Sequence, residues 1–313
     1  MICQYKIEKK LSFSLIFNTF LRMIILKIKN FALIGYNINY SLSPFIHERL
    51  FKISKINAKY NLINLKDITS QNYREILKKL DGYNVTTPHK INIIPFLDKL
   101  NNEAHFLGSV NTVKNSNSLA IGYNTDVDAF LLTMKNHNVN LKGNVLILGY
   151  GGLARALASK LLSINCNLIL AVRKNSLEKA KNALSFLKNK SFDNSSTLKI
   201  YELESLENLI KNNFNLLINA TPVGTFPNIN NLPVSENVIK KCDVVFDAVY
   251  NPYKTALLKE AKNLGKKAID GTEMLVLQAV LSHKIWAGVS FHENDIRKLI
   301  TETKVEIDRK FKI

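Results

Sequence analysis

The stretch Val145-Leu146-Ile147-Leu148 runs directly into Gly149-Tyr150-Gly151-Gly152-Leu153-Ala154, and these residues decide the fold. The four apolar, β-prone residues predict a buried strand, and the alanine-rich segment 155–162 predicts a helix. Glycines at 149 and 151 permit a tight turn and a close approach of the backbone to a ligand. The small Ala154 lets the helix pack closely on the strand, and the helix N-terminus offers partial positive charge. Strand, loop and helix in this order predict a dinucleotide-binding α/β fold.

The fingerprint begins at residue 149 of a 313-residue chain, so a long segment precedes it. That length suits two domains with ordinary cores. Strand and helix patterns alternate on both sides of the fingerprint, which predicts mostly parallel sheets with helices on both faces. We therefore expect an α/β protein with a substrate-binding catalytic domain over residues 23–127 and a Rossmann-like domain over residues 128–270.

Hydrophobic periodicity predicts the individual elements along the chain. The expected strands are 31–34, 60–65, 83–86, 110–114, 119–123, 145–148, 168–172, 216–219 and 244–248. The expected helices are 43–51, 73–80, 88–97, 128–136, 155–162, 177–187, 255–264, 273–286 and 292–311. Turn residues at 115–117 predict a hairpin, and the polar stretch 189–196 predicts a loop.

Composition narrows the class of protein. Apolar residues make up 46% of the chain and charged residues 22%, which is typical of a soluble globular protein. The formal charge of +18 raises the question of nucleic-acid binding. The lysines are scattered among Asn and Ile residues without an Arg-rich arm, so we expect no nucleic-acid partner. Three dispersed cysteines, Cys3, Cys166 and Cys242, predict neither a disulfide framework nor a metal site.

The first 22 residues differ in pattern from the rest of the chain. Lys6, Lys9 and Lys10 precede an apolar stretch over 11–21, which faintly resembles a secretory signal. Polar residues interrupt this stretch, it is too short to span a bilayer, and no small-residue cleavage site follows it. We interpret residues 1–22 as a dispensable extension, and we expect no membrane association.

The end of the strand 168–172 predicts which dinucleotide is bound. In this fold an acidic residue at that point binds the ribose 2′-hydroxyl of NAD, whereas arginine accommodates the 2′-phosphate of NADP. Here Arg173 and Lys174 follow the strand, and no carboxylate stands at its end. A guanidinium pairs with a phosphate through two parallel hydrogen bonds. The sequence therefore favours NADP over the simpler interpretation of two surface cations.

Before the fingerprint, Ser41-Leu42-Ser43-Pro44 predicts a helix start with two nearby hydroxyl groups. Ser43 suits the N-cap of that helix, and Pro44 suits the first helical position, which needs no N–H partner. Two hydroxyls at a helix N-terminus are a suitable cradle for a carboxylate. Ordinary capping explains Ser43 equally well when it is considered alone.

A second polar segment, from Asn84 to Lys90, also follows a predicted strand. Thr87 and Pro88 begin a helix and place Lys90 in its first turn, where the positive end of the dipole favours release of the ammonium proton. An amine that exchanges a proton readily is useful in acid/base catalysis, although an isolated lysine is more often a solvated surface group. We interpret the adjacent His89 as a surface residue. Asp126 is either a helix cap or the anion that orients Lys90.

Seven motifs in this order resemble those of the shikimate dehydrogenase family. They are Ser41-x-Ser43-Pro44, Asn84-Val85-Thr86-x-Pro88-x-Lys90, Val110-Asn111-Thr112, Gly122-x-Asn124-Thr125-Asp126, the Gly149 fingerprint, Ala220-Thr221-Pro222-x-Gly224 and Met274-Leu275-x-x-Gln278. The resemblance covers roughly residues 31–286, and the motifs are jointly very specific.

The resemblance implies an activity, a location and an arrangement of the C-terminus. It implies reversible, NADP-dependent reduction of 3-dehydroshikimate to shikimate in the cytoplasm, a step of aromatic amino-acid biosynthesis. It also implies that the helices of residues 271–313 return to the substrate domain. The chain is expected to act as a monomer or a homodimer. A quinate/shikimate dehydrogenase with relaxed substrate or NAD use is the alternative, and a non-catalytic NADP-binding sensor ranks below it.

The resemblance also assigns roles to individual residues. It implies that Lys90, paired with Asp126, is the acid/base group. It places the substrate carboxylate at Ser41, Ser43 and Tyr250, and the ring hydroxyls at Thr86, Asn111, Asp126 and Gln278. The implied cofactor-binding residues are Gly149, Gly151, Gly152, Leu153, Ala154, Arg173, Lys174, Ala220, Thr221, Gly271 and Met274.

Four positions depart from the family's usual residues. Val127 replaces a glycine after Asp126, Val172 replaces an asparagine, Lys174 replaces a threonine or serine, and Glu273 replaces a glycine. The change at 127 leaves the chemistry intact. The other changes lie beside the adenosine pocket or the nicotinamide, and they bear on the strength of the NADP preference.

Overall fold

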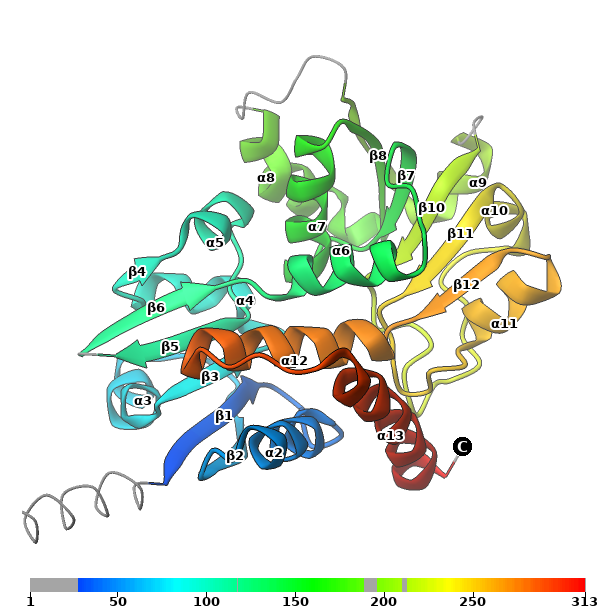
Figure 1. Ribbon diagram of the computed structural model, residues 1–313. Coiled ribbons are helices and arrows are strands. Elements are labelled where there is room, and N and C mark those ends of the chain that lie inside the picture. Colours follow the sequence, from blue (N-terminus) through cyan, green and yellow to red (C-terminus); the bar gives the residue numbers. More distant parts are fainter. Residues whose placement is uncertain (1–27, 117, 189–195, 210–212, 313) are drawn as a thin grey trace, which may run out of the picture.

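The computed structural model describes residues 28–116, 118–188, 196–209 and 213–312. These residues form two six-stranded sheets with helices packed against their faces (Figure 1). The expected α/β fold class with a Rossmann-like sheet is confirmed. Residues 1–22 and most of the expected loop 189–196 lie outside the described residues.

The second sheet is all parallel, in the order β12-β11-β10-β7-β8-β9. Its strands are β7 (Gly143–Leu148), β8 (Cys166–Val172), β9 (Leu198–Glu202), β10 (Phe214–Asn219), β11 (Cys242–Asp247) and β12 (Lys267–Asp270). Strands β8 and β9 lie on one side of β7, and β10, β11 and β12 lie on the other, so the direction in which strands are added reverses at β7. Open α/β sheets bind ligands at such a switch point. The glycine fingerprint follows β7 and therefore lies at that point.

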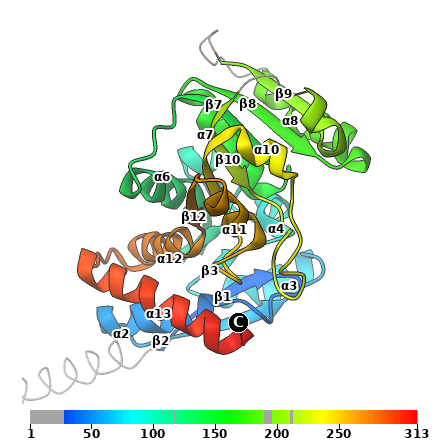
Figure 2. The same ribbon diagram turned by 90° about the vertical axis from the view of Figure 1, so that its right-hand side faces the viewer.

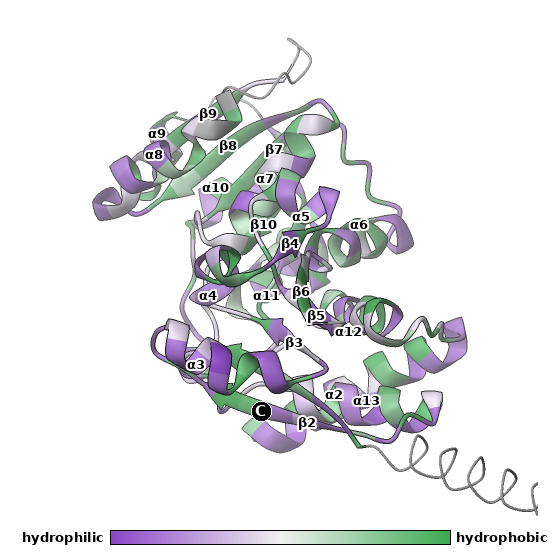
Figure 3. Ribbon diagram, turned by 90° about the vertical axis from the view of Figure 1, so that its left-hand side faces the viewer, coloured by the Kyte–Doolittle hydropathy of each residue, from purple (hydrophilic) through white to green (hydrophobic). Residues whose placement is uncertain are grey.

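Helices cover both faces of the second sheet, so its central strands are apolar on both sides (Figure 3). Val145 and Ile147 pack toward α7, whereas Leu146 and Leu148 pack toward α10 and α11. The helices are α7 (Gly152–Ser163), α8 (Leu177–Lys188), α9 (Leu206–Leu209), α10 (Glu236–Lys240) and α11 (Ala256–Asn263). Turns of 3₁₀ helix precede α8 at η3 (Lys174–Ser176) and α9 at η4 (Leu203–Ser205).

The first sheet is mixed, in the order β2-β1-β3-β5-β6-β4. Strand β5 runs antiparallel to both β3 and β6, and its pairing with β6 is the expected hairpin. The strands are β1 (Lys29–Gly35), β2 (Ala58–Asn64), β3 (Gly82–Val85), β4 (Lys99–Leu100), β5 (Thr112–Ser116) and β6 (Leu119–Tyr123). Ala32 and Ile34 face one core, and Phe31 and Leu33 face another, as period-2 alternation requires.

The helices of the first sheet are short, except for the first of them. They are α2 (Ser43–Ser54), α3 (Ser70–Glu75), α4 (His89–Asn92) and α5 (Asn102–Leu107), with 3₁₀ turns η1 (Leu77–Lys79) and η2 (Ile94–Phe96). The single helix expected over 88–97 is wrong, because Pro95 lacks an N–H group and its ring clashes with an α-helical carbonyl four residues earlier. The helix expected over 73–80 is likewise divided at Ile76, which has φ −118° and ψ −61°.

Three helices connect the two sheets (Figures 1 and 2). Helix α6 (Asp126–Asn136) links them in the chain, and α12 (Thr272–Ala287) returns along α6 to the first sheet. The Trp286 Nε1–H donates to Val113 O at 2.9 Å, and a Cβ at Gly82 would lie 2.5 Å from that nitrogen. Helix α13 (Glu293–Phe311) packs on α12 and α2. Among the described helices, none is long and apolar enough to cross a membrane.

Candidate active site

A cleft of about 420 Å³ separates the two sheets. Loops and helices that follow strands of the first sheet contribute Ser41, Ser43, Thr86 and Lys90. The connecting helices contribute Asp126 and Gln278, and the domain of the second sheet contributes Leu153 and Tyr250. Residues far apart in the chain therefore line one cavity.

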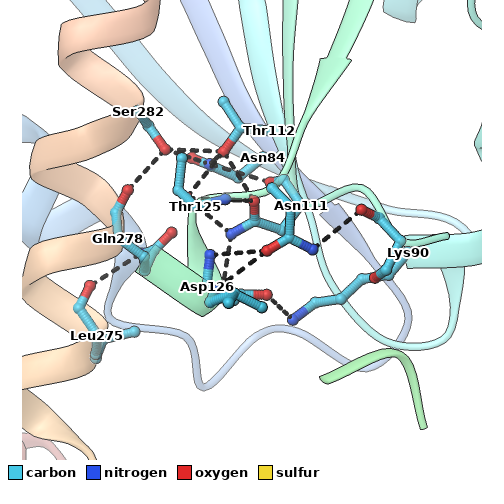
Figure 4. Close-up of polar contacts among 12 residues, drawn as sticks. Asn84, Lys90, Asn111, Thr112, Thr125, Asp126, Leu275, Gln278 and Ser282 are labelled. Carbon is cyan, nitrogen blue, oxygen red and sulfur yellow. Dashed lines mark hydrogen bonds and ion pairs between the residues drawn. The ribbon is translucent and has the colours of Figure 1, made fainter. Parts of the chain in front are cut away.

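Lys90 and Asp126 form the closest charged pair in this cleft (Figure 4). The Lys90 Nζ lies 2.6 Å from Asp126 Oδ2, and the side chains are only 15% and 10% exposed. Asp126 is the first residue of the eleven-residue helix α6, where the helix dipole stabilises a negative charge. Helix α4 spans only four residues, so few peptide dipoles act on the Lys90 ammonium. The close charged neighbour of this ammonium is the Asp126 carboxylate.

Asn111 holds the Asp126 carboxylate in place. Its Nδ2 donates to Asp126 Oδ1 at 2.8 Å and to Thr125 Oγ1 at 2.9 Å. Its Oδ1 accepts from the Thr125 N–H at 2.7 Å. Because both ends of the amide are bonded, Asn111 is oriented and one carboxylate oxygen of Asp126 remains directed at Lys90.

Behind Asn111 lies a buried polar network centred on Asn84. This residue was not among the predicted site residues. The Asn84 Nδ2 donates to Thr112 Oγ1 at 3.0 Å and to Ser282 Oγ at 2.9 Å, and the Asn84 Oδ1 accepts from the Tyr60 hydroxyl at 2.8 Å. Asn84 is 4% exposed and lines the cleft. Its place near the end of a buried strand, two residues before Thr86, was the signal available in the sequence.

Ser41 and Ser43 lie together at the start of α2. The Ser41 Oγ is 3.1 Å from Ser43 Oγ and accepts from the Ser43 N–H at 3.1 Å. The expectation that Ser43 is the N-cap is wrong: Leu42 is the N-cap, and Ser43 is the first helical residue with no side-chain cap bond. Tyr250 lines the same part of the cleft, and burial raises the pKa of its hydroxyl, which therefore remains a neutral donor.

His89 is buried, contrary to the expectation of a surface residue. It is 1% exposed, and its Nε2 lies 2.8 Å from Leu65 O. Helix α4 directs this ring into the first domain and the neighbouring Lys90 into the cleft.

The glycine loop lies directly beside Lys90. Gly149 has φ +98°, which favours glycine, and a Cβ there would lie 3.1 Å from Thr221 Cγ2. Gly151 is the N-cap of α7 and has open space where a Cβ would stand. A Cβ at Gly152 would lie 3.0 Å from Lys90 Cβ. The predicted phosphate loop and the predicted acid/base residue are therefore in contact.

The remaining predicted cofactor residues follow the carboxyl ends of the strands. Arg173 and Lys174 are exposed after β8, and Ala220 and Thr221 follow β10. Leu153, Gly271 and Met274 line the cleft, and Ala154, in the first turn of α7, is fully buried. Thr86 and Gln278 line the cleft as well, with the Gln278 Nε2 donating to Leu275 O at 2.9 Å.

Within the described parts of the chain, no group of three His, Cys, Asp or Glu side chains is arranged to hold a metal ion. Cys166 and Cys242 are buried and free, and Cys3 lies outside the described residues. Among the described residues that line the cleft, the charged side chains are Lys90 and Asp126.

A Rossmann-like sheet whose glycine loop touches a buried lysine–carboxylate pair, across a cleft lined by hydroxyl and amide groups, is typical of two-domain dehydrogenases. Residues 33–113 match the family model described as shikimate dehydrogenase substrate binding domain. The chain is 39% identical over 279 residues to "Shikimate dehydrogenase (NADP(+))" of Clostridium perfringens, covering 88% of this chain and 98% of the relative.

Two solved structures agree with that match. A shikimate dehydrogenase in complex with NADP+ has a TM-score of 0.75 and 33% identity, over 88% of this chain and 96% of that one. The enzyme of Thermus thermophilus in complex with NADP(H) and shikimate has a TM-score of 0.73 and 27% identity, over 88% and 99%. The chain belongs to the shikimate dehydrogenase family.

Proposed function

We propose that the protein catalyses the reversible, NADPH-dependent reduction of 3-dehydroshikimate to shikimate, with Lys90 as the acid/base group. The observation that carries the proposal is the Lys90–Asp126 pair, 2.6 Å apart, against the Gly152 backbone. A site that only bound the dinucleotide would need no such pair. Membership of the family and the cofactor named for its relatives support the same conclusion.

The residues around the glycine loop fit NADP. The turn at Gly149 and the open space beside Gly151 suit a pyrophosphate at the N-terminus of α7. The exposed Arg173 follows β8, where an acidic residue would instead repel a 2′-phosphate. When bound, the reduced nicotinamide supplies the hydride for the ketone carbon. We assign its surroundings to Ala220, Thr221, Gly271 and Met274.

Lys90 donates and accepts the proton that is transferred in the reaction. As an ammonium it stabilises the ketone oxygen while that oxygen gains negative charge, and then donates a proton to it to give the hydroxyl group. Asp126 keeps the amine directed into the cleft and offsets its charge, and Asn111 fixes Asp126. In the reverse direction the neutral amine accepts the proton from the hydroxyl of shikimate.

The polar groups of the cleft fit the other parts of the substrate. We assign the carboxylate to the hydroxyls of Ser41, Ser43 and Tyr250, which gather at one end of the cleft. The ring hydroxyls are assigned to Thr86, Asn111, Asp126 and Gln278, which line the cavity beyond. We further propose that residues 23–127 act as the substrate domain and 128–270 as the cofactor domain, in an enzyme of the cytoplasm.

The decisive test is the appearance of NADPH absorbance when the purified protein meets shikimate and NADP+. We expect rapid turnover with this pair, and slower turnover when NAD+ or quinate replaces either partner. Efficient use of quinate and NAD+ would favour the alternative dehydrogenase, and no turnover with any pair would reject the proposed function.

A further inference from the structure

Helix α13 ends beside the serines assigned to the substrate carboxylate. It buries a stripe of side chains spaced four residues apart, namely Leu299, Thr303, Ile307 and Phe311. Ile307 and Phe311 pack in one apolar cluster with Leu42, which precedes Ser43. The last turn of the helix is therefore held against the start of α2.

Ion pairs and hydrogen bonds hold α13 to both halves of the molecule. Glu302 Oε2 lies 3.1 Å from Arg49 Nε on α2. On the side of the second sheet, Lys304 Nζ lies 2.7 Å from Asp270 Oδ2. The Tyr253 hydroxyl also donates to Asp308 Oδ2 at 3.1 Å. These contacts give the C-terminal end of α13 a defined position relative to the cleft.

From that position, Lys310 reaches the loop of residues 36–42, which joins β1 to α2. The Lys310 Nζ donates to Ser41 O at 3.1 Å and to Asn39 O at 3.5 Å. The neighbouring Phe311 ring lies 6.2 Å from the Tyr40 ring, between centroids. The backbone on both sides of Tyr40 is thus tied to the end of one helix, and Ser41 is within the tied segment.

We propose that Lys310 is a positioning residue for the substrate carboxylate, acting through the Ser41 backbone. The inference rests on the proposed function. Two hydroxyls bind a carboxylate well only when their backbone is already ordered, since an unordered loop loses conformational freedom on binding. The Lys310 ammonium orders the Ser41 peptide and adds positive charge near the carboxylate end of the cleft.

The test is steady-state kinetics of Lys310→Met, which keeps the alkyl chain and removes the charge. We expect KM for shikimate to rise by about threefold to tenfold, the scale of a lost charged hydrogen bond at an exposed site. Turnover at saturation and KM for NADP+ should change little, because Lys90 and the glycine loop are untouched. Lys310→Arg should restore most of the affinity, since arginine also donates to carbonyl oxygens.

Arg309→Met is the matched control. Arg309 is the neighbouring cation on α13, and it pairs with Glu306 of the same helix instead of the loop. We expect this variant to leave KM for shikimate unchanged. An equal rise in both variants would mean that general charge attracts the substrate, and it would overturn the specific role of Lys310.

The methyl ester of shikimate separates carboxylate binding from general damage to the site. The ester lacks the negative charge, so Lys310→Met should lower kcat/KM for shikimate much more than for the ester. Equal losses for both substrates, or an unchanged KM for shikimate in an active enzyme, would overturn the inference. Failure of the proposed function is distinct, because the unmodified protein would then show no turnover of shikimate.

Discussion

Lys90 lies between two segments of backbone that restrict its position. Its carbonyl oxygen accepts from the Val110 N–H at 2.8 Å, and its Cβ faces Gly152. We expect Lys90→Ala to lose about 10²–10⁴-fold in kcat, the usual contribution of a positioned acid/base group, with a smaller change in shikimate binding. Stopped-flow or steady-state assays with a binding titration measure both quantities. Lys79→Ala, at an exposed lysine, is the control, and near-normal turnover of Lys90→Ala would remove the proposed role.

Arg173 is the residue on which we propose that the choice of cofactor depends. It is exposed immediately after β8, where its guanidinium is free to meet a 2′-phosphate. We expect Arg173→Ala to weaken the binding of NADP+ by about tenfold to a hundredfold and the binding of NAD+ very little, because only NADP+ carries the 2′-phosphate. Lys179→Ala, on the exposed face of α8, tests for general loss of positive charge. Equal losses for the two cofactors would contradict the contact.

At the scale of elements, the sequence predicted what depends on local pattern. The bounds of the strand predicted over 145–148 differ from those of β7 by at most two residues, and those of the helix predicted over 177–187 differ from α8 by one. These predictions are accurate because apolar periodicity is a local property. Three strands escaped prediction. Strand β4 has two residues, and β9 and β12 each alternate charged or polar side chains with only a few apolar ones. Their strand structure comes from pairing with β6, β8 and β11, which no local window contains.

The junction of β7 and α7 allows a prediction that separates stability from activity. In Gly152→Ala the new methyl group would press on Lys90, since its position is 3.0 Å from Lys90 Cβ. We expect kcat to fall about tenfold from displacement of the amine, while thermal stability stays equal or rises because alanine favours helices. Gly151→Ala has open space and does not touch Lys90. It should raise KM for NADP+ more than it lowers kcat, and identical kinetics in both variants would contradict this division.

At the scale of the molecule, the site depends on which helices join the two sheets. Asp126 lies on α6, Gln278 lies on α12, and these helices pack on each other. The sequence pattern offered Asp126 as a partner for Lys90 or as a helix cap, whereas Gln278 was predicted through the family resemblance alone. Which helices would pack together, and that His89 would turn inward, depends on contacts between distant segments. The buried His47–His283 pair escaped notice for the same reason.

His47 and His283 join α2 to α12 inside the apolar core. Their Nδ1 and Nε2 atoms are 3.1 Å apart, and the His47 ring stacks on Tyr60 at 4.0 Å. Burial lowers the pKa of His47 well below its ordinary value, and it lowers the pKa of His283 to about 3. Both rings are therefore neutral in the folded protein at neutral pH. Burial acts in the opposite direction on Asp247, whose pKa is raised to about 6.

The histidine pair makes the folded state sensitive to acid. In the unfolded chain a histidine accepts a proton below about pH 6.5, whereas the buried rings do not. The free energy of unfolding therefore has its full contribution from these rings above that pH and decreases as the pH falls below it. Each ring contributes a slope of about 1.4 kcal/mol per pH unit to the free energy of unfolding. Urea unfolding of His283→Gln between about pH 6 and pH 4 should show a slope smaller by about that amount. His105→Gln, at an exposed histidine, is the control. Asp247 is present in every variant, so its contribution cancels, and an unchanged slope in His283→Gln would contradict the prediction.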